Sequence, residues 1–347
     1  MAKRKKSGKE VKKQRWRIPV LLLQFALLIL VIICAYIIIQ IDSIPRNYID
    51  KSALEQVSLP GNFTNIALFG LDTRIDEPEM GARCDSIMVA SINNRTGEMR
   101  IVSVFRDTLL QLDNGFYEKA NAAYSFGGPQ SAVAMLNRNL DLDIEMFVTV
   151  NFNSLAAIID ILGGVEIELT SEEIMWTNLY ALDTSEHVGV PVPVSIDENQ
   201  PGRHTLDGVQ AVSFSRVRFT EGDDFRRAER QREVLDQVVS KARRANPMQL
   251  LRIKDEVIPL TSTNLTTGEI LLQFFNLLRM NLGDTKGFPM DLVTSGSLPG
   301  FVGDYVVPVT LADNVRQLHE FLFDEPQYQI TDRVQTISNE ISFMTGF

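Results

Sequence analysis

The pattern of hydrophobic and polar positions predicts a domain in which strands and helices share one core. This domain begins with three short apolar segments, and each is typical of a strand that is covered on both faces. They occupy residues 65–70, 86–92 and 99–105, with a hairpin turn over 93–98 between the second and the third. Because strands two and three form a hairpin, we expect the end of strand three to lie beside the start of strand two.

Helical and strand patterns alternate further along the chain, which favours a three-layer α/β (α-β-α) architecture. Pro129 is suited to the first position of a helix, and Asn153 to the N-cap of another. The predicted elements are helices over 129–140, 153–162, 206–212 and 314–323 and strands over 145–152, 165–169 and 306–308. Residues 170–203 show weak periodicity and are expected to form a long loop. The last residues, 326–347, have no clear partner, and we expect them to be partly disordered.

The first 41 residues predict a membrane anchor. Residues 1–17 hold nine Lys or Arg against one Glu, a net charge of +8, and residues 18–41 form an apolar run of 24 residues. Such a run is long enough to span a bilayer, and the basic flank predicts a cytoplasmic N-terminus with everything after the run outside. A cleaved signal peptide is the alternative, but the run is long for one and no small-residue cleavage site follows it. Residues 42–61, with a proline near each end, are expected to form a stalk before a domain over 62–325.

The net charge excludes one class of function. The whole chain carries −10, and removing the +8 of the N-terminal tail leaves −18 for residues 18–347. A nucleic-acid-binding domain is expected to be basic, so an acidic domain on the outer side of a membrane does not fit that class. Cys34 lies in the apolar run and Cys84 in the domain, so the two cysteines do not indicate a disulfide framework.

Against this acidic background, arginines concentrate in the segment SRVRFTEGDDFRRAERQ. Arg216 and Arg218 follow an apolar segment at alternate positions, so they point to the same side if the chain there is extended. Asp224 is suited to the N-cap of a helix, and Arg227 and Gln231 then fall on the apolar stripe of that helix. A guanidinium on the buried side of a helix needs a partner, and its planar fork fits a phosphate or a carboxylate. The alternative is a helix start in which Asp224 forms a salt bridge with Arg227.

Acids and arginines also alternate at the ends of the three predicted strands. If strand one lies antiparallel to strand two in the same sheet, these ends meet at one edge. The residues that would gather there are Asp72, Arg74, Arg83, Asp85, Arg106 and Asp107. Charged residues often only flank strands. This mixture of signs, however, suits a divalent cation and a phosphate held together, with carboxylates on the metal and guanidinium groups on the phosphate.

These segments are similar to those of the LytR-CpsA-Psr family of bacterial cell-envelope proteins. Seven pieces occur in the family's order behind one N-terminal anchor, and this combination is highly specific. They are NIALFGLDTR, RCDSIMVASIN, MRIVSVFRDT, KANAAYSFGG, VNFNSLAAIIDILGGVEIEL, LDGVQAVSFSRVR and GDDFRRAERQ. The resemblance is close over residues 62–246 and loose over 247–323. It implies an α/β fold, an α-β-α sandwich with a central mixed sheet and an apolar tunnel that binds a polyprenyl chain.

The resemblance also implies roles for the charged residues. The family's metal-binding acids fall on Asp72 and Asp85, so Mg²⁺ (or Mn²⁺) is the expected cofactor. Its pyrophosphate-binding residues fall on Arg83, Arg106, Arg216, Arg218 and Arg227, with Asp224 and Gln231 at the helix start. Cys84 and Arg226 depart from the family pattern, which usually has a small hydroxyl residue and a glycine there, but neither departure removes an expected ligand.

Members of the family carry a glycopolymer, such as wall teichoic acid or capsular polysaccharide, from an undecaprenyl-pyrophosphate carrier to peptidoglycan. The resemblance therefore implies a phosphotransfer in which a peptidoglycan sugar hydroxyl attacks the polymer-side phosphorus and lipid monophosphate leaves. Asp107 or Asp224 would serve as general base, and the sequence does not choose between them. Two alternatives stay open, a polyprenyl-pyrophosphate hydrolase and a non-enzymatic envelope regulator. The expected partners are the lipid-linked polymer, peptidoglycan and the membrane, with no nucleic acid.

Overall fold

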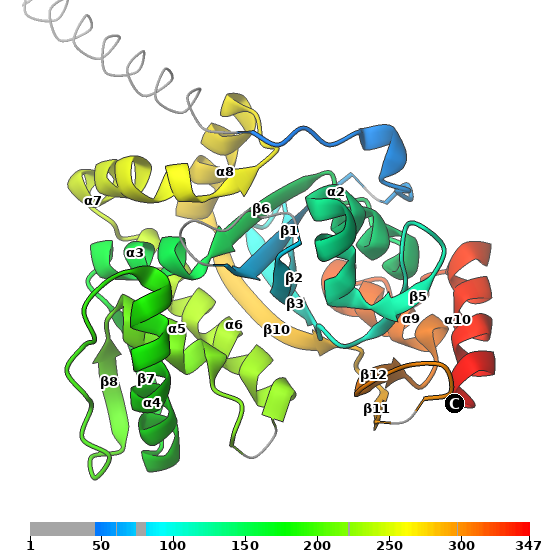
Figure 1. Ribbon diagram of the computed structural model, residues 1–347. Coiled ribbons are helices and arrows are strands. Elements are labelled where there is room, and N and C mark those ends of the chain that lie inside the picture. The colour runs from blue at the N-terminus through cyan, green and yellow to red at the C-terminus, as the bar shows by residue number, and fades with distance from the viewer. Residues whose placement is uncertain (1–45, 60, 74–80, 221–222, 297) are drawn as a thin grey trace, which may run out of the picture.

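The computed structural model describes residues 46–59, 61–73, 81–220, 223–296 and 298–347. Within this part of the chain, six strands form a central mixed sheet in the order β10-β3-β2-β1-β6-β9 (Figure 1). The strands are β1 (Phe63–Asp72), β2 (Arg83–Asn93), β3 (Glu98–Val104), β6 (Met146–Asn151), β9 (Ser262–Thr263) and β10 (Asn281–Phe288). β2 is antiparallel to both of its neighbours, and β6 runs parallel to β1. The three predicted strands and their antiparallel order are confirmed.

Two helices, α2 (Ala120–Leu140) and α9 (Leu311–Phe323), pack on one side of the sheet, and α10 (Asp332–Thr345) packs against them (Figure 1). Side chains alternate between the two faces of a strand, so Phe69 and Leu71 of β1 enter the core on this side. α2 kinks where Gly127 and Gly128 leave helical dihedral angles, and Pro129 follows the kink. The predicted helix start at Pro129 is therefore the start of the second half of a longer helix.

The opposite face of the sheet packs on α6 (Asp223–Ala242). Ile66 of β1 and Met88 of β2 point to this side and form a second apolar cluster. Leu235 and Val239 of α6 pack against that cluster. Helices therefore cover both faces of the mixed sheet, and the predicted α-β-α layering is confirmed.

A smaller unit lies beside the sheet, at the lower left of Figure 1. It contains β7 (Val165–Leu169), β8 (Gly202–Leu206), α3 (Phe152–Ile161), α4 (Ser171–Val188) and α5 (Gly208–Arg216). β7 and β8 pair antiparallel, with α4 between them in the chain, and their apolar residues share a core with Phe214 of α5 and Val234 of α6. This shared core fixes α5 and α6, and with them the arginine-rich segment, beside the edge of the main sheet.

Further helices and strands complete the described chain. Besides the helical turns η1 (Lys51–Ala53), η2 (Ile253–Val257) and η3 (Ile258–Leu260), they are β4 (Leu109–Gln111), β5 (Tyr117–Lys119), α7 (Pro247–Arg252), α8 (Thr267–Arg279), β11 (Leu292–Ser295) and β12 (Tyr305–Pro308). β4 pairs with β5 and β11 pairs with β12, both antiparallel. A bridge between Thr108 and Val306 joins these two hairpins directly after the end of β3.

The predicted loop over 170–203 is wrong, because its first half forms α4. A capping box starts this helix: the amide of Glu173 donates to the hydroxyl of Thr170, and the Glu173 carboxylate accepts from the amide of Thr170. Leu179 and Leu182 are exposed on the outer side of α4, 62% and 68%. Apolar residues therefore lie on both sides of the helix, which weakens the periodicity on which the prediction depended.

Two helix boundaries near the site also differ from the prediction. The N-cap of α3 is Asn151 rather than Asn153, and it forms a capping box. The helix before the arginine-rich segment, α5, continues to Arg216. The expectation of an extended chain that places Arg216 and Arg218 on one side is therefore wrong.

Both ends of the described chain pack on the domain. Ile49 and Leu54, in the predicted stalk, are 3% and 0% exposed and belong to the core on the α2 side. The predicted disordered tail instead forms α10, which buries Val334, Ile337 and Ile341 in the same core. Apolar burial thus extends beyond the predicted limits of the domain at both ends.

The predicted cytoplasmic tail and membrane span, residues 1–17 and 18–41, lie outside the described residues. In the part of the chain that is described, no helix is both long and apolar enough to cross a bilayer. The anchor therefore stays a prediction from the sequence.

Candidate active site

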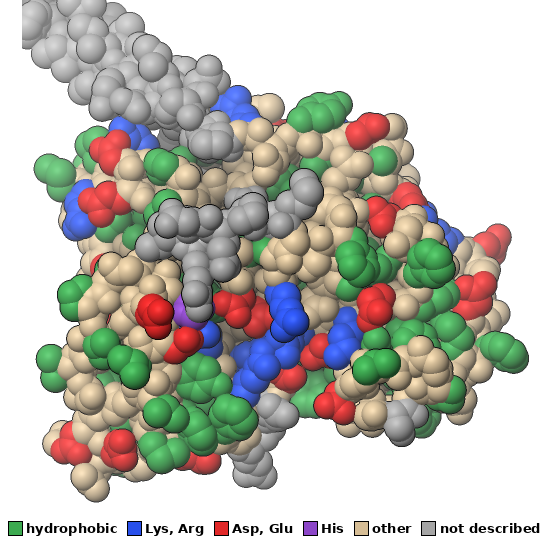
Figure 2. Space-filling view, in the orientation of Figure 1, with side chains coloured by type: hydrophobic (Ala, Val, Ile, Leu, Met, Phe, Trp, Pro, Cys, Tyr) green, Lys and Arg blue, Asp and Glu red, His purple; other side chains and the backbone are tan. Residues whose placement is uncertain are grey.

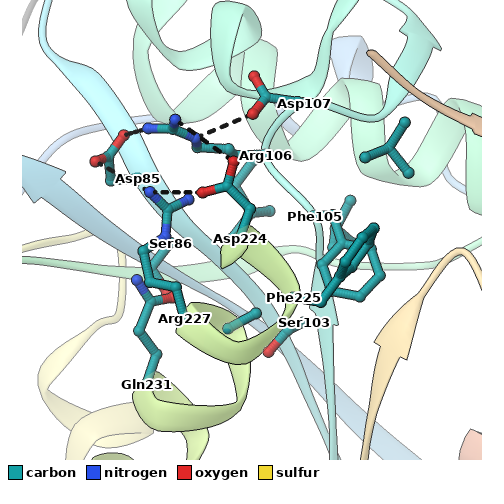
Figure 3. A pocket seen from close by; sticks show the side chains of 14 residues that line it. Asp85, Ser86, Ser103, Phe105, Arg106, Asp107, Asp224, Phe225, Arg227 and Gln231 are labelled. Atoms are coloured by element: carbon teal, nitrogen blue, oxygen red, sulfur yellow. Dashed lines mark hydrogen bonds and ion pairs between the residues drawn. The ribbon is translucent and has the colours of Figure 1, made fainter. Parts of the chain in front are cut away.

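The candidate site is built where the start of β2, the end of β3 and the start of α6 meet (Figure 3). The pairing of β1 with β2 is interrupted there: Gly70 faces Ser86 and Leu71 faces Cys84, so Asp85 has no partner on β1. Such a β-bulge re-aims the side chain of the extra residue, and the neighbouring Cys84 is fully buried. A Cβ at Gly70 would lie 2.9 Å from the Cβ of Ser86, so the bulge requires glycine opposite it.

Asp85 is the centre of the ion pairs at this edge. Its Oδ1 lies 2.8 Å from Nη1 of Arg106, and its Oδ2 lies 3.5 Å from Nη2 of Arg218 and 3.9 Å from Nη1 of Arg227. Burial opposes the charge of this carboxylate, but Arg106, Arg227 and Arg218 outweigh it and hold the pKa of Asp85 below its ordinary value. Asp85 is therefore ionised at neutral pH and held by three cations.

Asp224, in the first turn of α6, contacts the same three arginines. Its Oδ1 lies 3.2 Å from Nη1 of Arg227 and 3.5 Å from Nε of Arg218, and its Oδ2 lies 3.9 Å from Nη2 of Arg106. Because α6 begins at Asp223, Asp224 lies inside the helix rather than at the predicted N-cap. The alternative considered from the sequence, an ion pair between Asp224 and Arg227, is present, but it is one contact in a larger network.

Arg227 is the most buried cation of this network, at 4% exposed. Its Nε and Nη1 have no hydrogen-bond acceptor among the described residues, since the 3.2 Å contact with Asp224 is not aligned for one. Burial and the neighbouring charge of Arg106 lower the pKa of Arg227 to about 10, which leaves it charged at neutral pH. A buried guanidinium with unused N–H groups is a donor that an anionic ligand would satisfy.

These side chains line a pocket between the sheet and α6 (Figure 3). Gln231, about one turn after Arg227, lines it from the helix, and Phe105 and Phe225 pack edge to face at 4.7 Å on its apolar side. The pocket has a free volume of about 20 Å³, room for about one water molecule. The pocket is therefore too small to enclose a phosphate group. Arg218, which is partly exposed, lies 3.5 Å from Oδ2 of Asp85 in the pocket lining.

Lys119 is a member of the network that was not predicted from the sequence. It ends β5, and its Nζ lies 3.0 Å from Oδ1 of Asp107, whose Oδ2 lies 3.2 Å from Nε of Arg106. The connected network thus holds four cations, Arg106, Lys119, Arg218 and Arg227, and three carboxylates, Asp85, Asp107 and Asp224. It carries one positive charge in excess, and Figure 2 shows Lys and Arg side chains gathered in the middle of the visible face with Asp and Glu beside them. The lysine was visible in the segment KANAAY, but nothing local indicated its partner.

Two predicted residues lie beside this network. Asp72 and Arg83 are Cα partners where β1 ends and β2 begins, two positions before Asp85. Arg83 is exposed and lines a groove together with Arg106 and Asp107. Arg74, also predicted at this edge, lies outside the described residues.

Arg216 points to α4 rather than to the network. Its Nη2 lies 2.8 Å from Oδ2 of Asp183, and its Nη1 donates to the hydroxyl of Thr184 at 2.9 Å. The guanidinium also stacks over the ring of Phe152 at 4.7 Å. The described contacts therefore do not bring Arg216 together with the other predicted ligands.

Arg226 and Arg230 have structural partners. Arg230 is 1% exposed, and its Nε and Nη2 donate to Oε1 of Glu173 at 3.1 and 3.0 Å. It also donates to the carbonyl of Val217 and the hydroxyl of Thr220. Arg226 reaches the same Glu173 oxygen at 3.3 Å. These contacts fix the loop that carries Arg218 and leave Arg227 as the buried arginine of α6 that faces the pocket.

The donor set at this edge fits a magnesium ion only if a ligand shares it. No group of three His, Cys, Asp or Glu side chains able to hold a metal occurs in the described part of the chain. Mg²⁺, however, keeps several waters and is commonly held by one or two carboxylates together with substrate phosphates. Asp72 and Asp85, on neighbouring strands beside the arginines, are a donor set of that kind.

The chain and its fold are similar to known proteins. The chain is 29% identical over 243 residues to the polyisoprenyl-teichoic acid–peptidoglycan teichoic acid transferase TagU of Enterococcus faecalis, covering 69% of this chain and 72% of that one. It is 32% identical over 185 residues to the TagU of Bacillus cereus, covering 51% and 52%, so it spans about half of that relative. The fold matches a LytR-CPS2A-psr family protein, YwtF (TagT), with bound octaprenyl pyrophosphate lipid, at a TM-score of 0.53 and 18% identity over 84% of this chain and 95% of that one.

The family itself follows from a longer match. The profile of the LytR_cpsA_psr family matches residues 36–286, which is more than half of the chain and contains every residue of the charged network. The β11–β12 hairpin, α9 and α10 lie beyond the matched range. The chain belongs to the LytR-CpsA-Psr family.

Proposed function

We propose that this protein is a membrane-anchored phosphotransferase. It moves a glycopolymer, such as a wall teichoic acid or capsular polysaccharide, from a polyprenyl-pyrophosphate carrier to a sugar hydroxyl of peptidoglycan. Family membership and the names of the two TagU relatives support this substrate class. The site supports the chemistry, because phosphoryl transfer requires charge neutralisation and positioning more than a protein nucleophile.

The proposal depends on the environment of the Arg227 guanidinium. Its guanidinium is buried, faces the pocket and has two N–H nitrogens without a hydrogen-bond acceptor among the described residues. A pyrophosphate oxygen would satisfy these donors, and the positive excess of the network would match its charge. An arginine kept only for the fold would show the complete pairing of Arg230.

The proposed reaction is a single displacement at phosphorus. The acceptor oxygen forms a bond to the polymer-side phosphorus as the bond from that phosphorus to the bridging oxygen of the pyrophosphate breaks. Lipid monophosphate leaves, and a carboxylate of the site accepts the proton of the acceptor hydroxyl. Arg106, Arg218 and Arg227 stabilise the charge that develops on the leaving phosphate.

Asp72 and Asp85 would hold a Mg²⁺ or Mn²⁺ ion. When bound, the ion would neutralise charge on the pyrophosphate oxygens. The arginines that hold Asp85 would then share it with the metal. This assignment rests on the placement of the two carboxylates at adjoining strand ends.

The polyprenyl tail would occupy an apolar tunnel between the sheet and α6. The supporting observation is the apolar cluster of Met88, Ile101, Leu235 and Val239, which adjoins the side of α6 that carries Arg227. The structural relative YwtF (TagT), a protein of the same fold, contains bound octaprenyl pyrophosphate lipid. One continuous site would thus bind head group and tail.

The domain would act outside the cytoplasmic membrane, anchored by residues 18–41. The basic residues of 1–17 and the apolar run after them support this topology. Adding a protease to intact protoplasts tests it, because an external domain is digested and an internal one is protected.

Incubation of the full chain in detergent with a lipid-linked glycopolymer and peptidoglycan tests the function. The proposal expects polymer bound to peptidoglycan and release of lipid monophosphate. A protein that binds the lipid-linked polymer but leaves it intact would contradict it.

A further inference from the structure

A groove opens beside the charged network, on the side away from α6. It has a volume of about 540 Å³ and shares Arg106 and Asp107 with the pocket described above. Small-molecule and saccharide sites occupy roughly 300–1,000 Å³. A ligand that fills the groove therefore has one end at Asp107, beside the place where the pyrophosphate would bind.

The outer wall of the groove comes from the part of the chain beyond the family match. Gly300, Phe301, Val302 and Tyr305 line this side, and the match ends at residue 286. The wall therefore comes from this chain's C-terminal segment.

The wall is fixed to the network rather than attached loosely. The amide of Val306 donates to the carbonyl of Asp107 at 2.9 Å. The hydroxyl of Tyr305 donates to Glu118, and the Nζ of Lys119 lies 4.9 Å from the centre of the Tyr305 ring. The position of the wall is thus set by three residues at the groove floor.

Beside the charged side chains of Arg83, Arg106 and Lys119, the lining offers aromatic rings and polar groups that a saccharide can contact. Phe301 and Tyr117 supply ring surface for the apolar face of a sugar, and Asn121 and Glu118 supply polar groups for its hydroxyls. Pockets that combine aromatic rings with a few placed polar groups are typical of small polar ligands. Val302, at 92% exposed, stands at the rim.

The groove continues toward the C-terminal helix. Tyr117 also lines a second hollow of about 320 Å³ with Asn339, Phe343 and Met344 of α10. Its hydroxyl donates to Glu340 of the same helix. Tyr117 thus lies between the groove and the hollow beside α10.

We propose that this groove binds the acceptor glycan, with the reacting hydroxyl at Asp107. The inference rests on the proposed function and deepens it, because it assigns the acceptor subsite and selects between the two candidate bases. Asp107 lines both the pocket and the groove, whereas Asp224 lines the pocket and is held by three arginines. As the acceptor oxygen bonds to phosphorus, its proton passes to the Asp107 carboxylate.

The test compares two Val-to-Trp variants of the full chain. Val302→Trp narrows the groove at its rim, and Val194→Trp is the matched control, since Val194 is 89% exposed and lies in another part of the fold. For Val302→Trp we expect the KM for a soluble peptidoglycan oligosaccharide to rise about tenfold or more. In Val302→Trp, the KM for the lipid-linked donor should stay at the wild-type value. In Val194→Trp, the KM values for both acceptor and donor should stay at the wild-type values.

Other outcomes overturn the inference. If the KM for the acceptor is unchanged in Val302→Trp, the acceptor glycan does not bind in the groove. The proposed function still stands in that case, provided that the wild type transfers polymer. A rise confined to the donor KM assigns the groove to the donor's own sugars. If the wild type transfers no polymer, the proposed function is wrong, and the groove is tested by direct binding of the oligosaccharide. Binding by the wild type that Val302→Trp abolishes would support the acceptor site. Absence of binding by the wild type would overturn it.

Discussion

Nη1 of Arg227 lies 3.2 Å from Oδ1 of Asp224, one turn away on the same helix, without forming a hydrogen bond to it. The two groups are close enough for their charges to balance, but the N–H of Arg227 is not aligned to donate a hydrogen bond to Asp224. Both residues face Arg106 and Arg218 as well, so the turn concentrates positive charge beneath a small pocket. The site is therefore organised to gain energy when an anion enters.

Replacing Arg227 with methionine should separate ligand binding from folding. Arg227→Met removes the buried, incompletely satisfied charge, so the stability of the ligand-free protein should be unchanged or higher. Binding of the pyrophosphate head group should weaken by about 2–5 kcal/mol. Thermal denaturation with and without inorganic pyrophosphate measures both effects, because a ligand that binds only the folded state raises the melting temperature.

The matched control is Arg230→Met, one turn further along α6. Arg230 is fully paired with Glu173, Val217 and Thr220, and breaking a buried pair on one side costs about 3–5 kcal/mol. This variant should lose stability and keep the stabilisation by pyrophosphate. A pyrophosphate shift that persists in Arg227→Met would show that the anion binds elsewhere.

Asp72→Asn and Asp85→Asn should change the dependence on magnesium. Each substitution removes a charged oxygen ligand and keeps the size of the side chain. We expect the Mg²⁺ concentration for half-maximal activity to rise about tenfold or more, while the melting temperature of Asp72→Asn stays near that of the wild type. A magnesium titration of transfer activity is the measurement. Equal titration curves for wild type and both variants would remove these residues from the metal site.

His319 should make the fold sensitive to mild acid. It is fully buried, its Nε2 lies 2.9 Å from the carbonyl of Leu140, and burial lowers its pKa to about 4. Between its ordinary pKa of about 6.5 and about 4, the unfolded chain takes up a proton that the folded protein does not. The free energy of unfolding should therefore fall as the pH falls through this window, by about 3 kcal/mol in total from this group.

Urea denaturation of the wild type and His319→Gln at pH 7 and pH 4.5 checks this. The variant retains a donor but cannot be protonated, so its decrease in stability over the same interval should be smaller. Equal decreases in the two proteins would mean that His319 does not contribute to the acid sensitivity.

The C-terminal helix should be necessary for stability. Ile337 of α10 is 2% exposed in the core shared with α2 and α9, and Ile337→Ala should lower the free energy of unfolding by about 2–5 kcal/mol. Phe343 of the same helix is 90% exposed, so Phe343→Ala should change it by less than about 0.5 kcal/mol. Chemical denaturation of both variants tests the assignment. Equal small effects would agree with the disordered tail that the sequence suggested.

The sequence predicted the main sheet and the location of the site because both depend on local patterns. Apolar runs marked β1, β2 and β3, and the hairpin between β2 and β3 placed Asp85 and Arg106 at one edge. The helical spacing of α6 then placed Arg227 on its buried side. These features need only periodicity and the short connection between strands.

What the sequence did not predict depends on tertiary contacts. Lys119 meets Asp107 only because the β4–β5 hairpin folds back after β3. Arg216 pairs with Asp183 because α5 continues as far as Arg216 and lies beside α4. α10 has few local signals, and its stability comes from the core that it completes with α2 and α9. Such partners, distant in the chain, are not visible in a single sequence.

Following the polymer-side phosphorus distinguishes transfer to peptidoglycan from hydrolysis. A donor labelled at that phosphorus is incubated with the full chain, with and without peptidoglycan. For a transferase we expect label in peptidoglycan through a phosphodiester bond, one lipid monophosphate released for each polymer transferred, and negligible turnover without the acceptor. Release of labelled polymer phosphate into solution at the same rate with and without peptidoglycan would identify a hydrolase and contradict the proposed transferase function.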